Sequence, residues 1–551
     1  MTPTAPAPPT ARPSLFTPFT YGLFRAIWLA SVVSNIGTWM QNVAGVWLVT
    51  TLTTSVLLVA LMQTATSLPA FLLSMPAGAL ADLIDRRRLL LWTQAFMAVV
   101  AALLGGLAFM HEISALGVLA FTFLLGMGAA LNSPIWQTVT TELVPRSVLP
   151  AAITLNGVSN NIARAIGPAI GGALIAYYSA GWVFFLNGIS FLGTWAVVYF
   201  WKREATVTSG PAENFMGALR AGLRYVQYSP AIYGVLVRTF TFSFGTAAMW
   251  GLLSVVIARK LHLSAGHYGV MLSWLGGGAV TGAFLMGRAG GRLIFNQRVL
   301  LGVLIFAGTN VALAVVSQVY VLYAVMFVSG IAWLMVMTSF STTVQLNVPR
   351  WVQARVISIY MLVFQAGMSV GSLVWGELAD HATLEIALLA AAGWMLVSAL
   401  LALPFPMKSA EGLDLAPAEQ RPNTAENDGI DPDDGPVLVM IEYHVAPADW
   451  PAFHLAAEHL RRLRLRDGAL RAGVFADVTQ PTRITEFFYV ATWGEHQRQH
   501  HRFTREDQAV EAQVQRFHIE PEAPHVTHFL AFPHTSNVEV STPMPTLESQ
   551  R

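Results

Sequence analysis

The chain contains no cysteine and few charged residues, since Asp, Glu, Lys and Arg make up only 11% of its 551 residues. The absence of cysteine excludes disulfides, zinc–thiolate sites, cysteine-bound iron–sulfur clusters and thiol nucleophiles. A soluble globular protein carries about 25% charged residues, whereas 54% of this chain is hydrophobic. Most of the chain is therefore expected to lie in a membrane.

The net charge of +1 conceals an uneven distribution. Residues 1–406 hold 19 basic and 9 acidic side chains, whereas residues 407–551 hold the other 13 basic and 22 acidic ones. Charged residues thus make up about 7% of the first segment and about 24% of the second, a value typical of soluble domains. We therefore predict a membrane-embedded body followed by a soluble tail.

Twelve apolar runs between residues 24 and 405 are long enough to cross a bilayer, which takes about 20 residues each. They lie near residues 24–50, 56–81, 89–110, 114–137, 150–177, 181–201, 231–258, 266–288, 298–317, 319–341, 353–376 and 383–405. The predicted domains are a disordered leader (1–20), an N-terminal six-helix half (21–201), a cytoplasmic central loop (202–230) and a C-terminal six-helix half (231–406).

The central loop contains Phe215, Leu219, Leu223 and Val226 at steps of three and four. This spacing indicates either a short amphipathic helix on the membrane surface or an ordinary solvated connector. The basic residues predict the orientation of the body. With both termini cytoplasmic, thirteen Arg and Lys residues fall in cytoplasmic loops or at helix ends, and only Arg259 and Lys260 fall opposite. This distribution follows the positive-inside rule.

The two halves contain an ungapped internal repeat at an offset of 204 residues. It pairs Val144-Pro145-Arg146 with Val348-Pro349-Arg350, Gly167 with Gly371, and Gly172 with Gly376. The repeat places the fifth span on the eleventh, so the halves are expected to be parallel repeats. Such repeats hold the substrate site at their interface near the bilayer midplane.

Residues 407–436 are acidic and rich in proline, which predicts a disordered linker. After it, the pattern predicts strands at 437–443, 470–477, 484–493 and 526–532 and helices at 449–466 and 495–517. The order β-α-β-β-α-β is that of a ferredoxin-like α+β domain at 437–534. A free tail is expected at 535–551.

The loop between the second and third spans reads Gly78-Ala-Leu80-Ala-Asp82-Leu83-Ile-Asp85-Arg86-Arg87-Arg88. It resembles the loop signature of the major facilitator superfamily, with departures at Leu83 and Asp85. The resemblance implies a cytoplasmic latch. In it, Asp82 faces the beginning of the eleventh span, Gly78 allows close helix approach, and Arg86 or Arg87 pairs with Glu142. The alternative is that the arginines only anchor the topology.

The fifth span carries polar residues and glycines on one helical face, namely Asn156, Asn160, Arg164, Gly167 and Gly171. A charge inside a span is costly and usually faces a cavity or a partner, so Arg164 is the strongest candidate for the transport path. The run from Gly167 and Pro168 to Gly171 and Gly172 resembles the antiporter motif of exporters in the superfamily, although Ala163 replaces its preceding glycine.

Weaker candidates for a central cavity are Asn35, Gln41, Asn132, Gln137 and Gln365. Such side chains more often form hydrogen bonds between helices than contacts with ligands. In the tail, His496 and His500 stand four residues apart, which is the spacing of a helical metal pair. We favour histidines at the edge of the core over a metal site, and we expect no cofactor.

The N-terminal motifs Trp28-Leu29, Ser34-Asn35-Ile36-Gly37-Thr38-Trp39 and Leu68-Pro69 resemble the secretion-effector branch of the major facilitator superfamily, which includes an enterobactin exporter. The resemblance implies an all-α bacterial cytoplasmic-membrane transporter exporting a siderophore or drug-like molecule in exchange for protons. A nutrient importer is the alternative. The sequence contains no phosphate-binding loop, so transport driven by ATP is not expected. No nucleic-acid partner is expected either.

The tail resembles antibiotic-biosynthesis-monooxygenase-like domains around Trp493, Glu495, His496, His500 and Thr504. The resemblance implies dimerisation through this domain. Because a fold does not carry an activity, we expect a non-catalytic module. The alternative is an enzyme or a regulatory domain that acts on the transported molecule.

Overall fold

The computed structural model describes residues 14–83, 85–145, 147–201, 215–288, 294–407, 414–416, 418 and 430–531. For residues 74–83, 134, 137–138, 141–142, 215–219, 287–288 and 501, only the backbone is described. The chain forms two compact units. One comprises Met1–Phe215, Ala231–Leu346 and Ile357–Ser409, and the other comprises Met216–Pro230, Asn347–Val356 and Ala410–Arg551.

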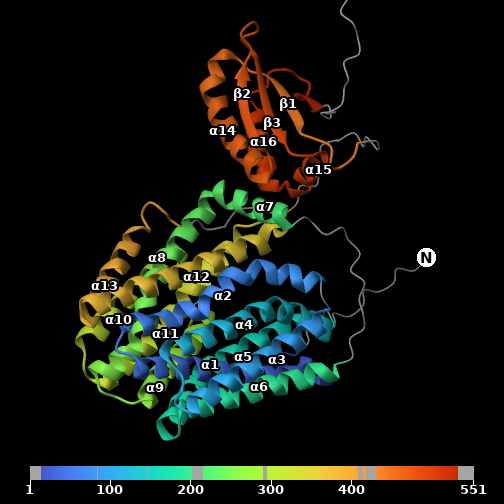
Figure 1. Cartoon of the computed structure of the whole chain (residues 1–551). Coiled ribbons are helices and arrows are strands. Elements are labelled where there is room, and N and C mark those ends of the chain that lie inside the picture. The colour runs from blue at the N-terminus through green and yellow to red at the C-terminus, as the bar shows by residue number, and fades with distance from the viewer. Residues whose placement is uncertain are drawn as a thin grey trace, which may run out of the picture. The chain divides into compact units, whose positions relative to one another are not determined.

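The described part of the first unit is a bundle of twelve long helices (Figure 1). The first half contains α1 (Gly22–Leu52), α2 (Val56–Leu83), α3 (Arg86–Phe109), α4 (Ala115–Leu143), α5 (Leu149–Tyr177) and α6 (Ala180–Phe200). The second half contains α8 (Pro230–Val255), continued by the π-helical turn η2 (Val256–Lys260), α9 (Ala265–Arg288), α10 (Phe295–Val315), α11 (Val319–Leu346), α12 (Arg350–His381) and α13 (Leu384–Leu400). These helices confirm the predicted all-α membrane body.

Nine of the described helices are both long and apolar enough to cross a membrane by length and composition. α13 is apolar but has only 17 residues. The other two long helices, α1 and α5, carry polar residues such as Asn35 and Asn156 within their spans. Both of these asparagines line a cavity inside the bundle, which explains why a purely apolar criterion misses these helices.

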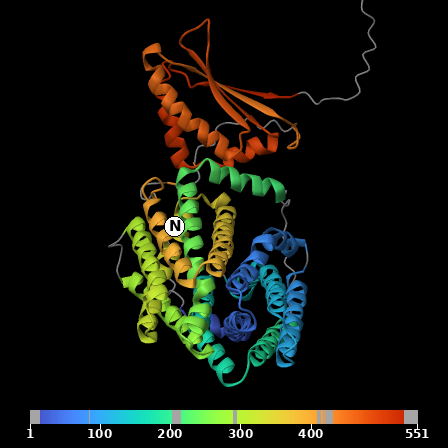
Figure 2. The ribbon, with the colours of Figure 1, turned by 60° about the vertical axis from the view of Figure 1, so that its left-hand side comes forward.

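The two halves lie beside each other, the first coloured blue to teal and the second green to orange (Figure 2). In the first half, α1 packs against α5 and α6, and α3 packs against α6. In the second half, α9 packs against α11, and α10 packs against α13. The contact between α5 and α9 joins the halves. We call the side where α1 begins the near side, and the side where α1 ends the far side.

The second unit contains α7 (Phe215–Gln227) and the tail domain. The tail consists of β1 (Val437–His444), η3 (Pro447–Asp449), α14 (Trp450–Asp467), β2 (Arg471–Ala476), β3 (Arg483–Val490), α15 (Trp493–Arg502), α16 (Arg505–Gln515) and β4 (His525–Leu530). Its four strands are antiparallel in the order β2-β3-β1-β4, with Val439 opposite Phe488 and His528. The helices cover one face of the sheet (Figure 1), which confirms the predicted ferredoxin-like arrangement.

The single helix predicted at 495–517 is wrong, because the chain breaks between α15 and α16. Phe503 is extended, with φ −67° and ψ 125°, and Thr504 caps the new helix. The Thr504 hydroxyl accepts a hydrogen bond from the Asp507 N–H, and the Asp507 carboxylate accepts one from the Thr504 N–H. This reciprocal capping box starts a second helix and stops the first.

Part of the segment predicted to be a disordered linker forms hydrogen bonds with residues at the break between α15 and α16. The Ala418 N–H donates to the Phe503 carbonyl (3.1 Å), and the Arg505 N–H donates to the Ala416 carbonyl (3.0 Å). The Asp414 carboxylate lies 3.3 Å from the Arg505 guanidinium. Residues 414–416 and 418 are therefore ordered against the tail, whereas the predicted boundaries of the domains stay predictions.

Candidate substrate path

A cavity of about 710 Å³ lies within the first half of the bundle. Its lining begins with Phe24 and Leu143 at the near-side ends of α1 and α4, and it reaches Thr38 and Phe191 deeper in the bundle. The lining residues that the structure describes are uncharged: Phe24, Ile27, Trp28, Ser31, Ser34, Asn35, Thr38, Gln94, Met97, Ala129, Asn132, Ser133, Trp136, Thr140, Leu143, Ile153, Asn156, Ser159, Asn160, Phe191 and Thr194. Its volume and mixed lining suit a drug-sized amphipathic molecule.

Four predicted site residues line this cavity: Asn35 and Asn132 from the cavity candidates, and Asn156 and Asn160 from the polar face of the fifth span. Three of the four also take part in hydrogen bonds between helices. Asn35 donates to the Ser159 hydroxyl at 3.3 Å, and Asn156 donates to the Thr140 hydroxyl at 3.0 Å. Asn132 accepts a hydrogen bond from Thr93 at 3.4 Å. Both interpretations of these asparagines therefore hold, because the same side chains join helices and face the cavity.

Gln94 is a cavity residue that the sequence analysis missed. It is 2% exposed, and its Oε1 has no hydrogen-bond partner among the described residues. A buried carbonyl oxygen without a partner costs about 1–3 kcal/mol, so a donor on a bound ligand would stabilise it. The available signal was a single amide within the apolar run of α3 from Leu89 to Leu104.

A second cavity, of about 200 Å³, lies between the two halves. Its lining includes Trp39, Gln41 and Gln63 from the first half and Trp250 and Trp333 from the second. Gln41 therefore contributes to a cavity, as predicted, and its side-chain oxygen also accepts a hydrogen bond from Asn187 at 2.6 Å. Gln365 lines neither of the two cavities.

Arg164 is half-buried in α5 and lines neither cavity. Its guanidinium lies 5.4 Å from the ring centroid of Trp39, which is within the range of a cation–π contact. Because Trp39 lines the smaller cavity, the Trp39 side chain separates Arg164 from the cavity between the halves. Its role in transport stays a prediction.

The glycines of α5 allow two other helices to approach closely. Gly167 and Gly171 face α1, where an added Cβ would lie 2.7 Å from the Trp39 Cβ and 2.9 Å from the Met40 Cα, respectively. Gly172 faces α9, where a Cβ would lie 3.0 Å from the Cα of Gly269. Gly167 and Gly171 thus bring α5 close to α1 within the first half, whereas Gly172 brings α5 into backbone contact with α9 of the second half.

The carboxylate of Asp380, near the far-side end of α12, joins the second half to the first. It accepts hydrogen bonds from the Ser55 hydroxyl at 2.6 Å, from the Leu57 N–H at 3.0 Å and from the Val56 N–H. These groups lie at the beginning of α2, where a negative charge is favourable because it faces a helix N-terminus. Asp380 therefore caps a helix of the opposite half.

Arg259, in η2 of the second half, makes the complementary contact. Its guanidinium donates to the carbonyls of Thr53 at 2.8 Å and Thr54 at 2.7 Å, just after the end of α1. Deeper in the bundle, the hydroxyls of Ser67 and Ser369 lie 2.6 Å apart. Ser67 and Ser369 each lie eleven residues, or about 17 Å of helix, from Val56 and Asp380. The halves are thus joined from the far-side surface to mid-membrane depth.

The match to known proteins covers nearly the whole chain. Residues 13–536 match the family described as transmembrane secretion effector, a branch of the major facilitator superfamily. The chain belongs to this family. It is therefore a multi-pass transporter of the bacterial inner membrane.

Several relatives of this secretion-effector transporter are curated. The multidrug efflux pump Tap of Mycobacterium tuberculosis is 24% identical, over 71% of this chain and 94% of Tap. The enterobactin exporter EntS of Salmonella typhi is 26% identical, over 49% of this chain and 64% of EntS. The staphyloferrin A transporter of Staphylococcus aureus is 28% identical, over 29% of this chain but only 41% of that protein.

Solved structures share the fold of the helical body. A bacterial homologue of the human lysosomal transporter Spinster has a TM-score of 0.56 at 14% identity, covering 70% of this chain and 96% of that one. The nucleoside transporter NupG has a TM-score of 0.56 at 12% identity, covering 70% of this chain and all of that one. The twelve-helix fold of the secretion-effector transporter is thus that of the superfamily.

The predicted loop motif of the transporter lies mostly outside the described side chains, which include none of Gly78, Asp82, Glu142 or the cavity candidate Gln137. Arg87 is described, and it donates to the carbonyls of Val198, at 3.1 Å, and Tyr199 near the end of α6. A cation at a helix C-terminus is favourable, so Arg87 anchors a helix end. The latch itself stays a prediction.

The predicted histidine pair of the tail is packed at the edge of the sheet. The Nε2 atoms of His496 and His500 are 3.3 Å apart, and the ring centroid of His528 lies 4.8 Å from that of His496. No group of three or more metal-ligating side chains occurs among the described residues. Burial, together with the charges of His500 and His528, lowers the pKa of His496 to about 3.

This lowered pKa predicts acid sensitivity of the tail. Between pH 6.5 and 3, His496 takes up a proton only in the unfolded tail, so the free energy of unfolding falls as pH falls, by about 1.4 kcal/mol per pH unit. In the fragment 430–531, His496→Gln should reduce the loss of stability between pH 6.5 and 4.5, measured by urea unfolding. His459→Gln, at an exposed site, is the control. Equal pH dependence in both variants would contradict the prediction.

Proposed function

We propose that this transporter exports an amphipathic small molecule, of the siderophore or drug-like class, by proton-driven alternating access. The observation that carries the proposal is the cavity of about 710 Å³, which combines uncharged hydrogen-bonding groups with the rings of Trp28, Trp136 and Phe191. Its lining starts at the near side, while the halves are joined at the far side through Asp380 and Arg259. This arrangement suits loading from the near side.

We assign the near side to the cytoplasm, with both termini there. Arg86, Arg87 and Arg88 begin α3 at the near side, and Arg350 begins α12 there. Among the described residues within the helices, the far-side ends carry the basic pair Arg259–Lys260. Positive charge collects on the cytoplasmic side of bacterial membrane proteins. Loading from the near side is then loading from the cytoplasm, which is export.

The known relatives support export over import. Tap is named as a multidrug efflux pump and EntS as an enterobactin exporter. The run from Gly167 to Gly172 resembles the antiporter motif, and its last glycine, Gly172, packs against α9 of the other half. Proton coupling rests on that resemblance, because none of the described side chains that line the larger cavity is acidic. The rival function is a nutrient importer.

Everted membrane vesicles test the direction of transport, because their interior corresponds to the cell exterior. With respiration acidifying the lumen, vesicles containing the protein should accumulate ethidium or an iron-free siderophore, and a protonophore should abolish the accumulation. Vesicles without the protein are the control. Uptake of the same compounds into intact cells, with none into everted vesicles, would establish import and refute the proposal.

For the tail, we propose a non-catalytic role. Its buried arginines are paired with carboxylates, as in the ion pairs of Arg466 with Asp467 and Asp507. The pairing of two tail domains stays a prediction. The sheet face that would carry it displays the rings of Phe475, Phe487 and Tyr489, and Phe475 is 65% exposed.

A further inference from the structure

The tail domain forms one compact unit with two segments of the transporter body, α7 and residues 347–356. α7 leads directly into α8, and residues 347–356 begin α12, so both segments start helices of the second half. The tail is therefore bound to the beginning of two helices that belong to the moving parts of the transporter.

Arg224 is the main polar contact from α7. Its guanidinium donates to the Gly468 carbonyl at 3.0 Å and to the Glu495 carboxylate at 3.2 Å. Gly468 ends α14 with φ +135°, and a Cβ there would lie 2.7 Å from the Glu495 Oε1. Glycine thus leaves room for the carboxylate that Arg224 binds. One helical turn later, Tyr228 packs against the hydrophobic core of the tail.

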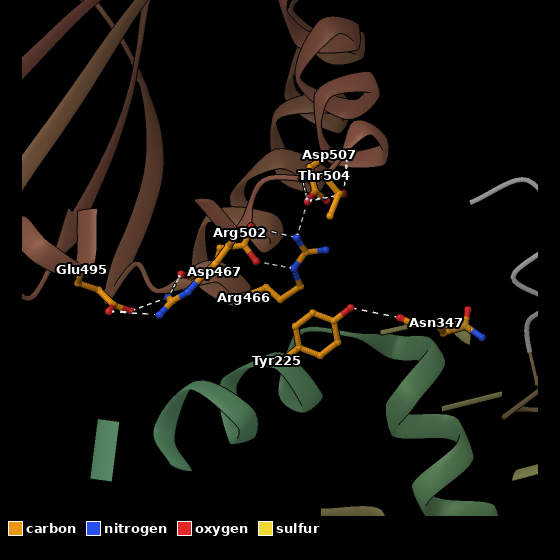
Figure 3. Close-up of polar contacts among 8 residues, drawn as sticks. All are labelled: Tyr225, Asn347, Arg466, Asp467, Glu495, Arg502, Thr504 and Asp507. Atoms are coloured by element: carbon orange, nitrogen blue, oxygen red, sulfur yellow. Dashed lines mark hydrogen bonds and ion pairs between the residues drawn. The ribbon is translucent and has the colours of Figure 1, made fainter. Parts of the chain in front are cut away.

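Two aromatic rings of the body meet two arginines of the tail; Figure 3 shows one of these pairs, Tyr225 beside Arg466. The Arg466 guanidinium lies 5.3 Å from the ring centroid of Tyr225, and the Arg502 guanidinium lies 4.6 Å from that of Trp351. The two rings are 6.0 Å apart, and the Tyr225 hydroxyl donates to the Asn347 carbonyl at 3.2 Å. Tyr225 therefore links α7, the beginning of α12 and the tail.

The tail holds both arginines in place before they meet these rings. Arg466 forms ion pairs with Asp467 at 2.7 Å and Asp507 at 2.8 Å. Arg502 donates to the Asp467 carbonyl and to the Glu495 carboxylate, both at 2.7 Å (Figure 3). All five of these side chains are largely buried. Buried charges are costly unless paired, so this network forms a rigid platform rather than a chance contact.

The contact also contains features of a reversible one. The Arg224 Nε and the Trp351 Nε1 are buried without hydrogen-bond partners among the described residues. Unpaired buried donors weaken a contact, and burial lowers the pKa of Arg224 although Glu495 opposes this.

We propose that the tail domain is a reversible brake on transport. In the tail, Arg466 binds Tyr225 and Arg502 binds Trp351. Glu495 of the tail binds Arg224. This inference rests on the proposed alternating-access function. The beginning of α12 is the segment that the predicted Asp82 latch engages in the outward-facing state. A tail bound there restrains that segment, so its release speeds the cycle.

The test is Arg224→Glu in the full-length protein, because the new carboxylate would repel Glu495. Hydrogen exchange of α7 and residues 347–356 should accelerate, and the transport rate in everted vesicles should rise about fivefold. Tyr225→Leu removes the ring without adding a charge and should give the same two changes. Arg220→Ala, at an exposed position one turn earlier on the same helix, is the control, because it supplies no carboxylate that could pair with Arg224, and it should change neither.

The failure of this proposal differs from that of the proposed function. If the wild type transports and either variant exchanges faster with an unchanged or lower transport rate, the tail is not a brake. Unchanged exchange in both variants would show that the contact does not hold these segments, and it too would overturn the proposal. A wild type that does not transport in everted vesicles would instead refute export.

Discussion

Replacing Gly269 with leucine should abolish transport while leaving expression and membrane insertion normal. Gly269 lies on α9 where it crosses α5, and an added Cβ would overlap the carbonyl oxygen of Pro168 and lie 3.0 Å from the Gly172 Cα. These are backbone atoms, so a small side-chain movement does not relieve the overlap. The far side would then fail to close, and the transport rate should fall at least about a hundredfold, because a conformation destabilised by about 3 kcal/mol is nearly unpopulated.

The matched control for this change is Gly277→Leu on the same helix. No heavy atom of the described residues lies within 4 Å of a Cβ built at Gly277, so the same substitution should be tolerated there. The two variants should be compared for transport in everted vesicles at equal protein levels. Transport by Gly269→Leu at the rate of the control would mean that the contact between α5 and α9 does not need to form during the cycle.

Replacing Arg164 with alanine should also lower the transport rate by about a hundredfold or more, while membrane insertion stays normal. A charged side chain inside a span costs at least about 2.5 kcal/mol, and this one lies against Trp39 at the smaller cavity between the halves. Arg164→Lys keeps the charge but loses the planar group that stacks on the indole. It should therefore restore only part of the rate.

Arg298→Ala is the matched control, because Arg298 makes the same type of contact, 5.5 Å from the Phe295 ring, near the near-side end of α10. Its removal should leave transport within about twofold of the wild type, since a cation–π contact near a helix end contributes little. Wild-type transport by Arg164→Ala would remove Arg164 from the mechanism. Equal losses in both variants would indicate that any arginine–aromatic contact is needed only for folding.

The twelve helices and the order of the tail elements were predictable because both leave periodic signals. Spans are long apolar runs, and the strands and helices of the tail alternate with turn residues. The polar face of α5 was predictable for the same reason, since Asn156 and Asn160 share a helical face and both line the larger cavity. The sequence also contains the capping box from Thr504 to Asp507. The apolar positions on both sides of it follow one helical spacing, however, so a single helix was predicted.

Other features leave no local signal. Gln94 is the only amide in the apolar helix α3, and only the fold shows that its oxygen is buried at the cavity without a partner among the described residues. The contacts of Arg224 with Glu495 and of Asp380 with Ser55 join residues more than 250 positions apart. Hydropathy and periodicity describe neighbours in sequence, so such contacts need the three-dimensional arrangement.

The central claim is that the halves open alternately, with the contacts at Asp380 and Arg259 forming the closed far side. The chain has no cysteine, so spin labels can be attached at introduced cysteines without background. One pair, Thr54→Cys with His381→Cys, reports the far side, and another, Ser147→Cys with Ile294→Cys, reports the near side. During proton-driven transport, pulsed electron spin resonance should show the far-side distance lengthening as the near-side distance shortens. Two distances that stay fixed, or that lengthen together, would contradict alternating access.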